Sequence, residues 1–270
     1  MKFNCSKTVL FRKTTLAAVC IITLLAGCKR TETLETMKLE ELVPLQVGKY
    51  ITYRVDSLVF TNSGKTEETH RYRVKHLIER KSTDNQNRPT WVVVTYITDS
   101  LGVGPWVQNG TYTITPVDKG LEVTEDNLRV LKLKQPIKEG FLWKGNSYLP
   151  DRPYNPEFPL SIDANMDLWE FKYGTINNAE KIGANTIPDV TTVLHIDSAE
   201  NVPMKTDTSF ASRELSLEKY AKNVGLVYRE LILWENQPNP RTTGSPPNIV
   251  VIYNPVRIGF GIKMWMIDRN

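Results

Sequence analysis

Large and polar side chains alternate with a period of two through much of the chain. In residues 51–56 (ITYRVD) and 71–76 (RYRVKH) every second side chain is apolar or aromatic, and residues 61–64 (TNSG) between them are typical of a turn. Successive side chains of a strand point to opposite faces. The alternation therefore predicts an antiparallel hairpin with one buried and one wet face.

Further segments rich in β-branched and aromatic residues predict more strands, each bounded by Gly, Pro or Asn. Residues 216–222 are ambiguous between helix and strand, and the tight turn at 223–225 favours a hairpin arm. Residues 237–248 are expected as an exposed loop. The remaining expected strands are residues 91–98, 106–115, 121–124, 128–133, 141–143, 168–173, 190–196, 226–234 and 260–267.

This pattern predicts a mainly β fold with few short helices. Each apolar sheet face needs burial and each sheet edge needs cover, so we expect a strongly curved antiparallel sheet or an incomplete β-barrel.

Prolines recur at every third position between residues 150 and 160. The spacing suits an extended polyproline-type segment, because each ring fixes φ and removes a backbone donor. The segment is either a docking ligand for a partner or a rigid connector between two halves of the sheet, and the connector is the favoured interpretation. The prolines are Pro150, Pro153, Pro156 and Pro159.

The first 27 residues have the composition of a secretory signal. They hold four basic and no acidic residues, and the 13 residues 14–26 (TTLAAVCIITLLA) carry no charge. A membrane-spanning helix needs roughly 20 apolar residues, so this run is too short to be one.

The apolar run ends in Leu25-Ala26-Gly27-Cys28, which resembles the lipobox of bacterial lipoproteins. The resemblance implies that the signal is removed and that acylated Cys28 anchors the chain in a membrane. An ordinary secreted protein with an incidental cysteine is the alternative. We expect residues 28–42 to be a flexible tether, with one helical turn near residues 37–42, and residues 43–270 to be a single large β domain.

The composition of the chain without the signal excludes some classes of protein. Subtracting its four basic residues leaves 34 − 4 = 30 basic against 30 acidic residues, so the mature net charge is near zero. No basic footprint typical of nucleic-acid binding remains. Two of the three cysteines lie in the signal and the third is Cys28, which excludes disulfides and cysteine metal sites in the mature domain.

Three segments carry a resemblance to a known family: VGKY at residues 47–50, KNVGLVY at 222–228 and GFGIKM at 259–264. Together they resemble an uncharacterised family of outer-membrane lipoproteins of Bacteroidota. The resemblance covers most of the mature chain and implies an outer-membrane location but no activity. The layout is also loosely similar to half-barrel lipoproteins that carry lipids, which is a fold analogy only.

Candidate metal ligands are few. His70 and His76 are expected on one strand face about 20 Å apart, at roughly 3.3 Å per residue, and His195 lies far away in the sequence. Each is expected to be a satisfied or exposed strand residue. Residues 163–167 (DANMD) place oxygen ligands as in a calcium loop, but that loop's glycine and bidentate glutamate are missing, which favours an Asx-rich turn. We expect no metal or cofactor.

Residues 216–219 match Ser-x-x-Lys, in which the lysine activates the serine. No Lys-Thr-Gly follows, and no Gly-x-Ser-x-Gly, Walker or dinucleotide motif is present. We therefore expect a protein that is not an enzyme, and an envelope hydrolase using Ser216 with Lys219 is the alternative.

Three Asp-Ser-apolar triplets resemble the sites that Bacteroidota O-glycosylate after export. Because all three lie near predicted strand ends, ordinary Asp-Ser turns are an equal alternative. The candidate acceptors are Ser57, Ser100 and Ser198.

Six tryptophans are spread over the predicted strands. They either line an apolar cavity that holds a lipid or stacks sugar rings, or pack the core and rim of a large sheet. They are Trp91, Trp106, Trp143, Trp169, Trp234 and Trp265.

Pattern and motifs together predict a non-enzymatic β domain of the bacterial cell envelope, anchored in the outer membrane through Cys28. It would bind an apolar or glycan ligand, or serve as an accessory subunit of an envelope complex. A structural module that uses the proline segment is a further alternative.

Overall fold

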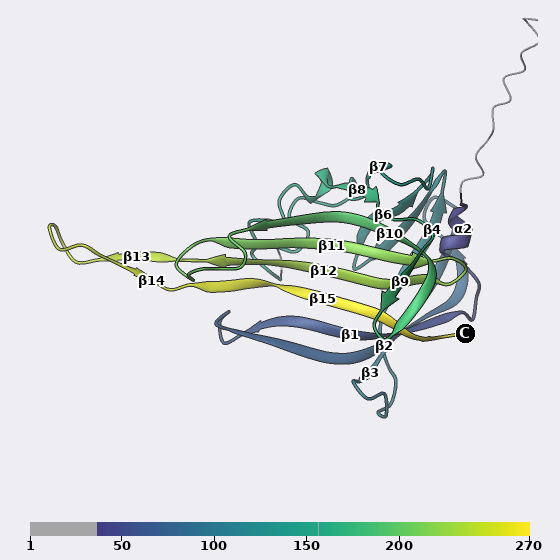
Figure 1. Cartoon of the computed structure of the whole chain (residues 1–270), viewed down its shortest axis with the longest axis horizontal. Helices are drawn as coiled ribbons and strands as arrows, with labels where there is room; N and C mark the ends of the chain where they lie inside the picture. Colours follow the sequence, from purple (N-terminus) through teal and green to yellow (C-terminus); the bar gives the residue numbers. More distant parts are fainter. Residues whose placement is uncertain (1–36, 156) are drawn as a thin grey trace, which may run out of the picture. The chain divides into compact units, whose positions relative to one another are not determined.

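One antiparallel sheet dominates the residues that the computed structural model describes, 37–155 and 157–270 (Figure 1). Its strand order is β6-β5-β4-β3-β2-β1-β15-β12-β11-β10-β8-β7, and β9 pairs with β10 beside this path. The signal, Cys28 and the first part of the expected tether lie outside the described residues. The strands are β1 (Tyr50–Thr61), β2 (Thr66–Thr83), β3 (Pro89–Asp99), β4 (Val107–Val117), β5 (Gly120–Glu125), β6 (Leu128–Lys134), β7 (Leu142–Lys144), β8 (Glu170–Tyr173), β9 (Asn178–Ile182), β10 (Asn185–Glu200), β11 (Ala211–Ala221), β12 (Gly225–Gln237), β13 (Pro240–Thr243), β14 (Val250–Tyr253) and β15 (Val256–Arg269).

The sheet curls into a nearly closed, barrel-like wall with one unsealed seam between its two end strands, β6 and β7. The expectation of a strongly curved antiparallel sheet or incomplete barrel is confirmed. Two short helices complete the described elements, α2 (Leu39–Leu42) and the 3₁₀ turn η1 (Met166–Leu168).

The hairpin of β1 and β2 follows the alternation of the sequence. Tyr53 and Val55 are buried inside the sheet, whereas Arg54 between them is exposed. The turn ends at Gly64, which has φ +76°, and a Cβ there would lie 2.2 Å from the carbonyl oxygen of Arg257. Only glycine fits both the backbone angle and the close approach of β15.

The ambiguous segment before residue 223 is a strand, as expected. It forms the C-terminal part of β11, which pairs with β12 over most of its length. Asn223 in the turn has φ +60°, a conformation that asparagine tolerates better than most residues.

The folded unit begins before residue 43. Leu39 and Leu42 of α2 are buried in the main core, and Leu42 is fully inaccessible. The Glu41 carbonyl accepts a hydrogen bond from the Asn223 amide at 2.6 Å, and its carboxylate lies 3.0 Å from the Lys222 ammonium. The last residues of the expected tether are therefore part of the domain, because this turn has an apolar face to bury.

The proline segment is not extended, which corrects the expectation of a polyproline-type connector. In its described residues, the Asn155 amide donates to the Arg152 carbonyl at 3.1 Å and the Phe158 amide to the Tyr154 carbonyl at 2.8 Å, so the chain folds into consecutive turns. Proline fixes φ near −65°, which suits turn positions as well as extended ones, and the spacing did not separate the two.

These turns bind to the inner face of the sheet. The rings of Tyr154 and Phe158 pack on Phe260 of β15, with centroids 5.2 and 5.0 Å away. Glu235 of β12 is fully buried and accepts hydrogen bonds from the amide and hydroxyl of Ser161, both at 2.8 Å. The segment between β7 and β8 thus covers part of the interior.

The expected loop at residues 237–248 is partly a strand, which is a second correction. β13 lies within it and pairs with β14 in a two-stranded ribbon that extends past the ends of β12 and β15 (Figure 1). Pro240 is tolerated because β13 is an edge strand. Residues 249–253 (IVVIY) of this ribbon are all apolar or aromatic and 45–57% exposed.

Within residues 37–155 and 157–270, no helix is long and apolar enough to cross a membrane.

Side chains hold most of the seam. Among the described residues, one backbone hydrogen bond crosses it, from the Leu131 amide to the Gly145 carbonyl at 2.8 Å. The Trp143 indole donates to the Leu131 carbonyl at 2.9 Å. The Tyr173 hydroxyl accepts from the Lys134 amide at 3.1 Å and donates to the Lys134 carbonyl at 2.9 Å.

Tyr173→Phe tests this account of the seam. Tyr173 is fully buried, so the change leaves both backbone groups of Lys134 without their partner and should lower the free energy of unfolding by roughly 1–3 kcal/mol. Urea denaturation measures the loss. Tyr253→Phe, which removes the hydroxyl of a tyrosine that is 45% exposed, is the control and should change little. Equal stability of the two variants would mean that the Tyr173 hydrogen bonds do not hold the seam.

Candidate ligand cavity

The curled sheet surrounds two neighbouring cavities that are partly open to solvent, of about 510 Å³ and about 100 Å³. Four residues line both of them: Val123, Glu125, Lys132 and Arg229. These side chains separate the larger cavity from the smaller one, and three of the four carry a charge.

The walls of the larger cavity are mainly apolar. They come from strands of both halves of the sheet and from the segment between β7 and β8. The described apolar side chains that line it include Val59, Leu128, Val130, Leu149, Tyr154, Phe158, Met166, Trp169, Phe171, Leu231, Phe260 and Ile262.

Charged groups meet where the cavities adjoin. Arg229 Nη1 lies 2.9 Å from Glu125 Oε2, and Lys132 Nζ lies 2.8 Å from Glu218 Oε1. Arg229 Nε is 3.6 Å from that same Glu218 oxygen, and the Tyr220 hydroxyl donates to Glu218 Oε2 at 2.6 Å. The buried ion cluster, meaning Glu125, Lys132, Glu218 and Arg229, is thus continuous.

Mutual attraction keeps the cluster charged despite its burial. Burial alone would raise the pKa of Glu218, but Lys132 and Arg229 hold it well below its ordinary value. Arg229 likewise lowers the pKa of Glu125. Burial opposes the charge of Arg229, but Glu125 and Glu218 raise its pKa further. Burial lowers the pKa of Lys132, and Glu218 beside it counteracts part of this effect. Two cations and two anions face one another, with no net charge.

Two members of the cluster keep accessible surface although they lie within the curled sheet. The side chain of Arg229 is 22% accessible and that of Glu125 is 38% accessible, whereas that of Glu218 is 3% accessible. Because Arg229 and Glu125 line both cavities, part of this surface faces the cavities and is available to a bound molecule.

A serine–histidine pair lies on the wall of the larger cavity. His195 Nδ1 is 2.8 Å from Ser216 Oγ, and the imidazole stacks on Phe171 with a centroid distance of 3.8 Å. His195 Nε2 has no hydrogen-bond partner among the described residues and lies 3.8 Å from Glu218 Oε2. Burial lowers the pKa of His195 to about 3, so the ring is neutral at physiological pH and a weak general base.

The structure contradicts the pairing of Ser216 with Lys219. Ser216 points into the curled sheet, whereas Lys219 forms an ion pair with Glu180 of β9. Residues three apart on a strand lie on opposite faces, so the Ser-x-x-Lys spacing cannot bring the two side chains together in β11.

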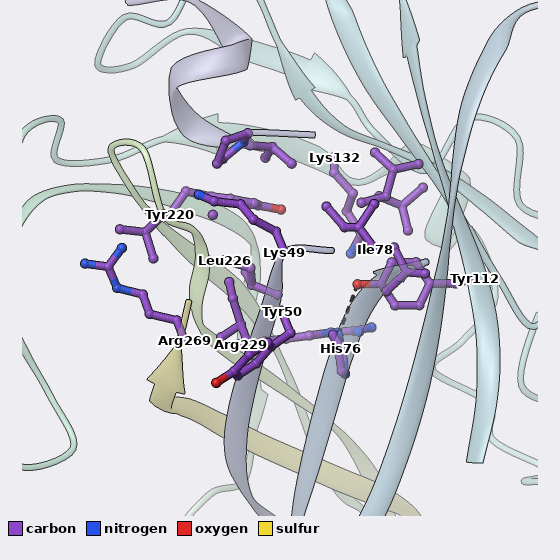
Figure 2. Close-up of a pocket in the computed structure, with 18 of the residues that line it drawn as sticks. Lys49, Tyr50, His76, Ile78, Tyr112, Lys132, Tyr220, Leu226, Arg229 and Arg269 are labelled. Carbon is purple, nitrogen blue, oxygen red and sulfur yellow. Dashed lines mark hydrogen bonds between the residues drawn. The ribbon is translucent and has the colours of Figure 1, made fainter. Parts of the chain in front are cut away.

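The smaller cavity is lined by a second histidine, which is half-buried. His76 Nδ1 lies 3.0 Å from the Tyr112 hydroxyl, and Figure 2 shows the two side chains pointing toward one another. Lys49, Tyr50 and Arg269 line the same cavity. Burial lowers the pKa of His76 to about 4.

Of the six tryptophans, the structure brings only Trp169 to the cavity lining. Trp143 is buried in the core beside it. The other four are half-buried and do not line either cavity: Trp91, Trp106 and Trp265 lie under the cations of Lys81, Lys75 and Arg54, and Trp234 packs edge-on against Phe60.

The three candidate glycosylation sites differ in environment. Ser57 lies in the middle of β1 rather than near a strand end, its hydroxyl contacts that of Tyr72, and it lines the larger cavity. A glycan on Ser57 would have to fill the interior, which corrects the placement of this candidate. Ser100 is exposed in the turn after β3, and Ser198 is exposed on β10.

The described residues contain no group of three or more His, Cys, Asp or Glu side chains that could hold a metal ion. In the expected Asx-rich turn, Asp163 is fully buried, and burial raises the pKa of its carboxyl group. Its Oδ2 accepts a hydrogen bond from the Tyr154 amide at 3.3 Å, and its Oδ1 has no partner among the described atoms. His70 is exposed and contacts Glu68 at 3.1 Å.

Sequence reasoning missed the ion cluster, although β12 carries a signal for it. Arg229, Leu231, Leu233 and Glu235 occupy alternate positions that face the interior, so two charged residues stand in this inward row beside apolar neighbours. A charge at such a position is rarely buried without a partner. Its partners could not be found from the sequence, because Glu125 and Lys132 come from strands about a hundred residues away.

The fold and the cavity define a class of protein: a barrel-like antiparallel sheet with an internal cavity and a buried, charge-neutral ion cluster at one end of it. No protein-family model matches the chain, and a search of curated proteins finds no significant match.

The two histidines that line the cavities, His76 and His195, predict that acid destabilises the fold. The unfolded chain binds a proton on each histidine below about pH 6.5, whereas the folded protein does so only near pH 4 for His76 and pH 3 for His195. Unfolding therefore takes up protons between these values, and stability falls as the pH is lowered through this window. Between pH 7 and 4.5 we expect a loss of about 2–3 kcal/mol for each of these two histidines.

His76→Phe should remove one histidine's share of this pH dependence. Urea unfolding at pH 7, 6, 5 and 4.5 gives the slope. The control is His70→Phe, which changes a histidine with a 55% exposed side chain and should keep the wild-type slope. An unaltered slope in His76→Phe would contradict the assignment.

Proposed function

We propose that the chain is a lipid-anchored protein of the bacterial outer membrane that binds a small, largely apolar ligand inside its curled sheet without catalysing a reaction. The observation that carries this proposal is the cavity of about 510 Å³. Small-molecule sites are typically cavities of this order, lined by apolar side chains with a few convergent polar groups.

A cavity of this volume is not ordinary packing. Protein interiors are close-packed, so an open space of this size inside the sheet leaves apolar side chains without packing partners. The aromatic side chains Tyr154, Phe158 and Phe260 pack against one another at its wall, yet the space beside them stays open. A ligand with an apolar body would supply the packing contacts that these side chains lack.

Two other features support the envelope part of the proposal. The lipobox-like Leu25-Ala26-Gly27-Cys28 follows directly after an apolar signal run, and acyl chains on Cys28 would supply the membrane anchor. The exposed apolar residues of the β13–β14 ribbon supply a surface for an envelope protein partner. A glycan ligand fits less well, because only one tryptophan faces the cavity.

A hydrolase is the second candidate, and the contact between His195 and Ser216 favours it. Nucleophile and base lie within hydrogen-bonding distance on a cavity wall, as covalent catalysis requires. The low pKa of His195 weighs against it, because a base that is protonated only near pH 3 takes up the serine proton poorly at neutral pH. Binding therefore remains the favoured function.

Blocking the larger cavity should abolish ligand retention. Ile262 lines this cavity, so Ile262→Trp fills part of it. Ile232→Trp is the matched control on the neighbouring strand, because Ile232 packs on the outer face beside Gly261 and Leu58. Native mass spectrometry of the full chain purified from its membrane should find a bound small molecule on wild type and Ile232→Trp, and at least tenfold less on Ile262→Trp.

A wild-type protein without any bound molecule, or equal retention by both variants, would count against an interior site. A cleaved ligand in wild type together with an intact one in Ser216→Ala would favour the hydrolase.

The lipid anchor has its own test. Cells fed with labelled palmitate should incorporate the label into the wild-type chain, and Cys28→Ala should lose it, because the acyl chains need the Cys28 thiol. Immunoprecipitation followed by autoradiography measures the label. Label that persists in Cys28→Ala would refute acylation at this residue.

A further inference from the structure

The polar end of the larger cavity indicates which chemical class of ligand it takes. Resting on the proposed function above, we infer that the ligand is an uncharged amphiphile whose hydroxyl-bearing head group hydrogen-bonds to both Arg229 and Glu125, with its apolar chain extending along the larger cavity. Neither the fold nor the motifs assign a head group, and the inference depends on the charges and donors of the ion cluster.

Charge balance at the cluster disfavours an ionic head group. Arg229 and Lys132 are matched by Glu125 and Glu218, and His195 beside them is neutral because burial lowers its pKa. An added anion or cation would be buried without a counter-charge, which is costly in a low-dielectric interior.

The rim of the larger cavity further disfavours anions. Asp126 and Glu157 line it and are exposed, and neither has a counter-ion among the described residues. A carboxylate or phosphate that entered past them would meet like charge before it reached Arg229. An uncharged head group meets no such barrier.

The cluster has both a hydrogen-bond donor and an acceptor without a partner among the described residues. Arg229 uses Nη1 toward Glu125 Oε2, and within the described residues no hydrogen bond engages its Nη2. Glu125 Oε1 likewise accepts none from them. Both side chains retain accessible surface, 22% for Arg229 and 38% for Glu125.

A donor and an acceptor side by side match a hydroxyl group. A hydroxyl both donates and accepts, so one or two of them can accept from Arg229 and donate to Glu125 at the same time. A carboxylate only accepts and would leave Glu125 unsatisfied, and an ammonium only donates and would leave Arg229 unsatisfied.

The remaining cavity accepts an apolar chain. Most of the side chains that line it away from the cluster are apolar, among them Val59, Val130, Phe260 and Ile262. The cavity thus has a polar end and an apolar body, which match the head group and the chain of an amphiphile. A free sugar would match only the polar end, and a pure hydrocarbon would match only the apolar body.

Three probes that share one chain and differ in head group test the inference. Octyl glucoside, octanoate and octyltrimethylammonium are titrated, each below its micelle concentration, into the full chain held in amphipol, and tryptophan fluorescence reports binding because Trp169 lines the cavity. We expect octyl glucoside to bind wild type at least tenfold more tightly than either ionic probe.

A charge change in the cluster should invert this preference. Glu125→Gln keeps the shape of the side chain but leaves the cluster with one excess positive charge, so octanoate should gain at least tenfold in affinity relative to octyltrimethylammonium. Glu139→Gln is the matched control, because Glu139 is exposed and does not line either cavity. It should keep the wild-type order.

The outcomes separate this inference from the proposed function. If no probe binds wild type, the interior site itself fails. If octanoate or octyltrimethylammonium binds wild type most tightly, the interior site stands and the uncharged head group is refuted. An unaltered preference in folded Glu125→Gln would refute the placement of the head group at the cluster, and the wild-type comparison decides alone if that variant does not fold.

Discussion

The pairing of β1 with β15 joins the first long strand of the domain to the last, and the rest of the structure depends on it. On one side of this pair lie β2 to β6 in unbroken sequence order, and on the other lie β12 to β7. Nine residues of β1, from Ile51 to Val59, have partners in β15. Without this contact the chain would form two separate meanders, each with an apolar face exposed, and there would be no enclosed interior.

The ion cluster connects the same two halves by charge. Glu125 and Lys132 belong to β5 and β6, whereas Glu218 and Arg229 belong to β11 and β12. Each short contact, Arg229 with Glu125 and Lys132 with Glu218, therefore crosses the interior from one half to the other. Buried ion pairs seldom add much net stability over apolar packing, because desolvation offsets their attraction. Removing one partner is costly, however, so the cluster favours the arrangement in which all four groups meet.

Local patterns in the sequence predicted where the strands lie, but they did not predict which strands and side chains meet across the interior. The alternation in residues 51–56 and 71–76 predicted both the β1–β2 hairpin and its buried face, because a period of two depends only on neighbouring residues. The joining of the two halves of the sheet depends on contacts across some two hundred residues, such as Tyr53 with Met266, and no local pattern specifies those. The sequence therefore supported curvature, and the structure was needed to show the nearly closed wall.

The candidate site residues that the sequence misplaced were also judged from local patterns alone. Ser57 follows an aspartate and was expected near a strand end, but β1 continues through Thr61 and turns the serine inward. The tryptophans were grouped by residue type, whereas their position depends on which face of a strand each one occupies. Trp169 reaches the cavity from the end of η1, outside the alternation of any strand, and Trp234 lies on the outer face of β12.

Fewer backbone hydrogen bonds hold the two strands together at the seam than hold the long neighbouring strands together elsewhere in the sheet. To part β1 from β2 or β11 from β12 is to break a long ladder of backbone hydrogen bonds at once. To part β6 from β7 is to break, in the described part of the chain, one backbone bond and a few side-chain contacts of Trp143 and Tyr173. Regions with few hydrogen bonds open at the lowest free energy. The sheet can therefore open at the β6–β7 seam, so the width of the interior can change while the other strands stay paired.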